Sequence, residues 1–163
     1  MEAKEKYNLE FKAKVAKTFL KTVSAYANYN DGEIIFGIDD NGDLTGINAA
    51  KDESLRIENM INDSIAPVPD FGIEVREIDK KEIIILGVKK GKDTPYYYQG
   101  KTYKRSDTST IEVDRFELRR LAIEGINIDY EERKAYSQNL RFSKLESQLK
   151  EKAGIKKINL DIL

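Results

Sequence analysis

The stretch that most constrains the fold is residues 5–46, where a helical pattern is followed at once by an apolar strand. Residues 13–28 carry apolar side chains at intervals of three and four, which predicts a helix with one broad apolar face. After a turn signal, residues 33–38 form an apolar run of strand length. Because such a helix must bury its apolar face, we expect it to lie on a sheet that contains this strand. The residues expected in the core are Val15, Phe19, Val23, Ile34, Ile35, Phe36, Ile84 and Leu86.

The rest of residues 1–125 reads as short strands, hairpins and helices joined by short loops. The pattern predicts a strand at 9–12, a hairpin turn at 39–42 with a return strand at 43–47, a helix at 51–65, a hairpin formed by 73–78 and 82–88, a hairpin formed by 95–98 and 101–104, a loop at 105–110 and a helix at 113–122. Asp114 is the expected N-cap of the last helix.

The character of the chain changes after residue 125. We expect residues 1–125 to form one domain and residues 126–163 to form a helical C-terminal extension, with charged, weakly amphipathic helices at 129–136 and 143–153. The apolar residues of the extension continue to Leu163. Our hypothesis is that the extension begins a further region of a longer protein.

The composition excludes several classes of site. The chain of 163 residues contains neither histidine nor cysteine, which excludes disulfides, thiolate metal sites and catalysis by histidine or cysteine. Any catalysis must therefore use carboxylates, lysines, tyrosines or a bound metal. No apolar run is long enough to cross a membrane, so we expect a soluble, cytoplasmic protein without a membrane partner.

Charge is segregated along the chain, although the net charge is only −1. Residues 1–30 are net basic, and residues 31–70 are strongly acidic. A near-neutral total leaves room for a local basic face beside an acidic one.

The basic residues allow two interpretations. On a helix over residues 13–28, the stripe opposite the apolar face holds Lys14, Lys17, Lys21, Ser24 and Asn28. Such a stripe is usually only the solvated side of a helix. The functional interpretation is that its lysines bind phosphates, with Ser24 and Asn28 adding hydrogen bonds. The further candidates for this surface are Lys12, Lys101, Lys104 and Arg105.

Four tyrosines also allow two interpretations. Tyr96, Tyr97, Tyr98 and Tyr103 could stack on nucleic-acid bases, as aromatic side chains do in single-strand binding proteins. We prefer the interpretation that alternate tyrosines pack against a sheet face.

Four motifs, in the right order, resemble those of the Schlafen AlbA-like domain. They are LEFK, KTVSAYAN-x-x-x-G, IIFGIDDNGDLTGI and YKRSDTST, and the resemblance covers residues 5–122. It implies an α/β (α+β) fold, in which a mixed, mostly antiparallel sheet is flanked by helices. It also implies a nucleic-acid-binding module, which in bacteria and archaea usually opens a predicted transcriptional regulator.

The resemblance further implies a candidate catalytic site. In some vertebrate Schlafen proteins, acids at the positions matching Glu5, Glu10 and Asp40 form a metal-dependent RNA-cleaving site. Three convergent carboxylates would suit Mg²⁺ or Mn²⁺, which prefer oxygen ligands. The plainer interpretation is that Glu5 and Glu10 are surface charges or partners of lysines. Asp39 and Asp40 would then be turn residues.

Three functions therefore remain open. The first is a DNA-binding module of a transcriptional regulator, which depends on the lysines and the resemblance. The second is a metal-dependent endoribonuclease that acts on structured RNA through Glu5, Glu10 and Asp40. The third is a protein-interaction module, which the acidic residues 31–70 would suit. The sequence leaves open whether the protein forms a homo-oligomer.

Overall fold

The structure is a computed structural model, and it describes residues 4–132. Residues 1–125 are one of the two units into which the chain divides. The main sheet of this unit has four strands in the order β1, β2, β5, β4. Their bounds are Leu9–Lys12, Gly32–Phe36, Lys81–Val88 and Phe71–Ile78. β1 and β2 are parallel, and the other two pairings are antiparallel, which confirms the predicted mixed, mostly antiparallel α+β sheet.

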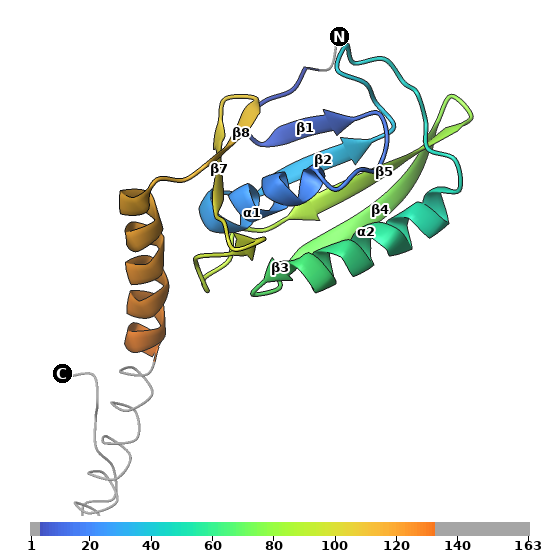
Figure 1. The fold of residues 1–163 in the computed structure, drawn as a ribbon. Coiled ribbons are helices and arrows are strands. Elements are labelled where there is room, and N and C mark those ends of the chain that lie inside the picture. Colours follow the sequence, from blue (N-terminus) through green and yellow to red (C-terminus); the bar gives the residue numbers. More distant parts are fainter. Residues whose placement is uncertain (1–3, 133–163) are drawn as a thin grey trace, which may run out of the picture. The chain divides into compact units, whose positions relative to one another are not determined.

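Two helices, α1 (Phe19–Tyr29) and α2 (Ala50–Ser64), lie over one face of this sheet (Figure 1). The core forms between them and the strands, where Phe19 meets Phe36 edge to face at 5.3 Å. Of the eight predicted core residues, only Val15 and Ile35 are partly exposed. Ile35 points to the other face because side chains alternate along a strand.

The helix predicted over residues 13–28 begins six residues later, at Phe19. The parallel strands β1 and β2 must be joined by a crossover, and residues 13–18 carry the chain out of the sheet into the helical layer. Lys14 therefore precedes the helix, and Lys17 lies in the turn before it. The periodic pattern did not reveal this because it continues unbroken through the turn.

Three of the smaller predictions were wrong. The predicted loop at 105–110 is a hairpin of β7 (Tyr103–Ser106) and β8 (Ser109–Glu112), which turns at Asp107 with a positive φ of 56°. The predicted hairpin 95–98/101–104 keeps only a bridge between Tyr98 and Lys101, because β6 (Tyr97–Tyr98) pairs instead with β3 (Ile65–Ala66). Likewise, one bridge, Ile38–Leu44, replaces the return strand at 43–47.

The remaining elements agree with the prediction, with shifted ends. α2 and the β4–β5 hairpin are present, and the last helix is capped by Asp114, whose carboxylate accepts a hydrogen bond from the Glu117 N–H at 2.8 Å. That helix runs over residues 115–132, ten residues beyond its predicted end. The predicted break before a separate helix at 129–136 is therefore wrong, since residues 129–132 continue the same helix; residues 133–136 lie outside the described residues. The helix predicted at 143–153 lies outside the described residues. None of the helices described is both long and apolar enough to cross a membrane.

Candidate functional site

Ser24 and Asn28 lie in the interior, so their predicted position on an exposed stripe is wrong. Asn28 is 0% exposed, and its amide both donates to the Tyr96 carbonyl (3.0 Å) and accepts from the Tyr96 N–H (2.7 Å). The Ser24 hydroxyl donates to the same carbonyl at 2.8 Å. The backbone N–H and carbonyl of Tyr96 are thus hydrogen-bonded by two side chains of α1, and not by a neighbouring strand. Asn28 is therefore not accessible to a ligand in this structure.

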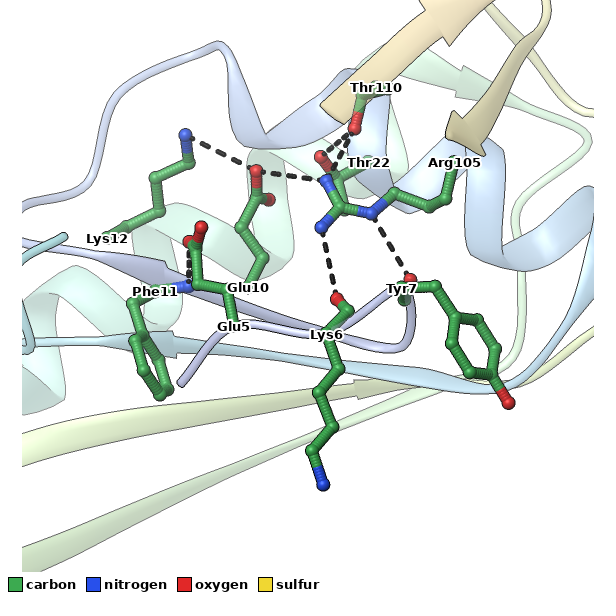
Figure 2. Close-up of polar contacts among 9 residues, drawn as sticks. All are labelled: Glu5, Lys6, Tyr7, Glu10, Phe11, Lys12, Thr22, Arg105 and Thr110. Carbon is green, nitrogen blue, oxygen red and sulfur yellow. Dashed lines mark hydrogen bonds and ion pairs between the residues drawn. The ribbon is translucent and has the colours of Figure 1, made fainter. Parts of the chain in front are cut away.

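Arg105 is also buried, although the sequence indicated a surface contact. Its side chain is 2% exposed, and its guanidinium lies over the Tyr26 ring at 5.9 Å. Figure 2 shows its polar partners, which come from both ends of the unit. They are the Tyr7 carbonyl (3.2 Å), the Lys6 carbonyl (3.3 Å), the Glu10 carboxylate (3.4 Å) and the Thr110 hydroxyl (2.9 Å). Arg105 thus ties the hairpin β7–β8 to the N-terminal segment.

Glu10 and Glu5 lie near this guanidinium but have different contacts (Figure 2). Glu10 is 7% exposed, and one of its oxygens, Oε1, lies 3.5 Å from Lys12 Nζ in addition to its contact with Arg105. Its other oxygen, Oε2, is buried without a partner among the described residues. Glu5 accepts a hydrogen bond from the Phe11 N–H at 2.8 Å, on the free edge of β1. This bond satisfies an edge donor that would otherwise be open to another strand.

The third predicted acid, Asp40, is exposed in the turn after Ile38. Its neighbour Asp39 accepts hydrogen bonds from the N–H groups of Asn41 and Asp43, both at 2.9 Å, which confirms the turn interpretation for Asp39. Among residues 4–132, no three acidic side chains are placed to hold one metal ion. The structure therefore does not bring Glu5, Glu10 and Asp40 together around one point.

Three exposed lysines of the first thirty residues, Lys14, Lys17 and Lys21, pair with no acid among the described residues. Lys21 lies over the ring of Tyr103 at 5.7 Å, so this lysine reaches β7, which begins two residues after Lys101. We call Lys14, Lys17, Lys21 and Lys101 the lysine surface.

The other two basic candidates are held by acids. Lys104 Nζ lies 2.6 Å from Glu117, and Lys12 is paired with Glu10 as described above. Even within the lysine surface, Lys101 lies 3.5 Å from Glu112, although both side chains are more than half exposed. Exposed ion pairs of this kind contribute little free energy, so they do not hold the lysine tightly.

The tyrosines fill the interior, as the plainer interpretation predicted. Of the four tyrosines considered above, Tyr96, Tyr98 and Tyr103 are buried, and Tyr97 is exposed. Tyr26, on the apolar face of α1, is 0% exposed, and desolvation strongly raises its pKa. Gly32 leaves room for it, since a Cβ at that position would lie 2.5 Å from the Tyr26 ring.

Comparisons with known proteins give one family and two solved structures. The family model described as "Schlafen, AlbA_2" matches residues 1–114. Among curated proteins there is no match. The DIP2311 protein from Corynebacterium diphtheriae shares 19% identity with a TM-score of 0.56, and the alignment covers 69% of this chain but only 23% of that one.

The second structure is the N-terminal domain of a protein from Nitrosomonas europaea described as related to the ATP-dependent DNA helicase RecG. It shares 18% identity with a TM-score of 0.51, and the alignment covers 69% of this chain and 85% of that one. At these identities, both structures support the fold alone.

Proposed function

Because this chain belongs to the Schlafen AlbA_2 family, we propose that residues 1–125 bind nucleic acid through the lysine surface. The observation that carries the proposal is the exposure of Lys14 and Lys17 without an ion pair among the described residues. Lysine ammonium groups bind phosphate as point charges, and most protein–nucleic-acid hydrogen bonds go to the backbone. Lys21 and Lys101 extend this surface across α1 to the segment before β7.

We further propose DNA as the nucleic acid and a role in transcriptional regulation. The similarity to the N-terminal domain of a RecG-related protein supports DNA, since RecG is a DNA helicase by description. Contacts to phosphates carry no base information, so the lysine surface would supply affinity and not sequence preference. A regulator would then take its specificity from other groups.

Salt dependence of binding tests the proposal. The double variant Lys14→Ala/Lys17→Ala should lower the slope of log K against log salt concentration on duplex DNA by about 1.8, because each lost phosphate contact contributes about 0.9. Affinity should fall equally for unrelated sequences. The matched control is Lys51→Ala/Lys89→Ala, which removes the same charge from exposed positions outside this surface. Equal salt slopes for the two double variants would refute the proposal that the lysine surface binds phosphates.

One observation favours the endonuclease as the second candidate: the buried Glu10 Oε2 has no partner among the described residues. An orphaned carboxylate oxygen is costly and needs an explanation. The test is cleavage of structured RNA with Mn²⁺, with and without EDTA. Asp40→Asn is the informative variant because Asp40 is exposed in its turn and its loss leaves the interior intact. RNA that stays intact, or is cut equally by Asp40→Asn, rejects the three-acid site.

A further inference from the structure

The outer edge of β4 carries hydrogen-bonding groups that no described element uses. β4 is the last strand of the main sheet and has β5 on one side only (Figure 1). Next to the end of this ladder, the Lys89 N–H donates to the Asp70 carbonyl at 2.9 Å. Because hydrogen-bonded pairs alternate along antiparallel strands, the backbone groups of Ile73, Val75 and Glu77 point away from β5. Such a row is a template for another strand.

The side chains of this edge are open as well. Val75 is 40% exposed and Ile78 is 43% exposed. Glu74 and Arg76 lie on the same face of the strand and pair with each other at 2.7 Å, with more than half of each side chain exposed. The centre of this edge is therefore the apolar Val75, with the acid Glu74 before it and the base Arg76 after it.

Neither backbone conformation nor packing within the described unit explains why residue 72 of β4 is a glycine. It has no left-handed φ, and a Cβ added to it would meet nothing within 4 Å. Glycine weakens a strand interior, and in that position it often marks a close approach by another chain or a ligand. No contact within the described unit requires glycine at this position.

We propose that β4 pairs with β4 of a second copy of this chain, antiparallel, about a two-fold axis at Val75. In this register, the outward backbone groups of the two copies face each other. Glu74 of each copy lies opposite Arg76 of the other, and Ile78 lies opposite Gly72. The missing side chain of Gly72 leaves room for the exposed Ile78 of the second copy.

Charge selects this register over its neighbours. A two-fold axis at Glu74 sets two copies of that carboxylate against each other, and an axis at Arg76 does the same with two guanidinium groups. Like charges directly opposite destabilise a strand pair, whereas opposite charges stabilise it. Of these three axes, only the one at Val75 gives two attractive pairs between Glu74 and Arg76, and a C2 contact requires such self-complementarity. Pairing of two edge strands buries less surface than the roughly 1,600 Å² of a standard protein–protein interface. We therefore expect a weak dimer, whose population depends on the protein concentration.

Sedimentation equilibrium of the full chain over a wide concentration range tests the dimer. We expect self-association of the wild type, and at least roughly tenfold weaker association of Glu74→Arg and of Arg76→Glu, because each variant sets like charges opposite one another. An equimolar mixture of the two single variants should associate again, as a heterodimer in which every cross-strand pair is attractive. Glu58→Arg, on exposed α2, is the control and should associate like the wild type.

The mixing experiment separates the register from general charge effects. A wild type that stays monomeric at all concentrations overturns the proposal. Association that survives Glu74→Arg places the interface elsewhere. Single variants that fail to associate when mixed exclude the axis at Val75. Val75→Pro removes an outward N–H and leaves the β5 ladder intact, so it should abolish association while the circular dichroism spectrum stays native.

Discussion

Gly32 is required by packing, whereas Gly87, in the neighbouring strand, is not. A Cβ at Gly32 would lie 2.5 Å from the buried Tyr26 ring, while a Cβ at Gly87 would meet nothing within 4 Å. We expect Gly32→Ala to lower the free energy of unfolding by about 1–3 kcal/mol, the usual cost of overpacking. Gly87→Ala should be neutral or stabilise by up to about 1 kcal/mol. Denaturant melts of both variants measure this, and equal losses would show that Tyr26 does not fill the space above Gly32.

Residue type alone predicted the wrong environment for Asn28 and Arg105. Both are polar, and both fall where the local pattern indicates a solvated surface. Each is buried by segments distant in sequence: Tyr96 covers Asn28, and the N-terminal residues cover Arg105. Such contacts have no local periodicity, so they could not be predicted from spacing. By contrast, the turn role of Asp39 was predictable because its hydrogen bonds reach only a few residues along the chain.

At the scale of elements, Glu117 fastens the start of the last helix to the rest of the unit. Its carboxylate accepts hydrogen bonds from Lys104 in β7 (2.6 Å) and from the Tyr29 hydroxyl at the end of α1 (3.0 Å). The hydrogen bond from Lys104 holds the pKa of the Glu117 carboxyl below its ordinary value. A carboxyl with a depressed pKa contributes stability above its unfolded pKa of about 4.3 and loses that contribution as the pH falls.

The measurement for Glu117 is a pH series of denaturant melts. The wild type should exceed Glu117→Gln in free energy of unfolding at neutral pH. The difference should shrink as the pH falls below about 4.3, where the wild-type carboxyl takes up a proton. Glu58→Gln, exposed on α2, is the control and should track the wild type. A difference independent of pH would mean that charge at position 117 contributes nothing.

Strand and helix periodicity predicted α2 and the β4–β5 hairpin within a residue or two, since both have clear apolar patterns bounded by turns. It misplaced the start of α1 and missed β8. In both cases the decisive interaction is tertiary: a crossover between parallel strands in the first, and pairing with Tyr103–Ser106 in the second. Tertiary contacts of this kind outweigh the local propensity of a segment for helix, strand or loop.

At the scale of the whole unit, Arg105 joins the two ends of residues 1–125, and its charge is matched by Glu10. Removing one member of a buried ion pair leaves an uncompensated charge, which typically costs about 3–5 kcal/mol. Arg105→Met should therefore be destabilising, since it removes the buried one of the two cations beside the Glu10 carboxylate and leaves only the partly exposed Lys12. Glu10→Gln in the same chain removes the undercompensated charge, so the double variant Glu10→Gln/Arg105→Met should be more stable than Arg105→Met alone.

The same pair of variants separates structure from binding. Since the Arg105 side chain is 2% exposed, it should contribute no phosphate contact. The folded double variant should then bind duplex DNA with the wild-type salt slope, whereas a direct contact would lower that slope by about 0.9. Thermal melts establish the fraction folded, and binding is compared per folded molecule. A double variant no more stable than Arg105→Met would show that the backbone contacts to Lys6 and Tyr7, and not the charge pair, hold the two ends together.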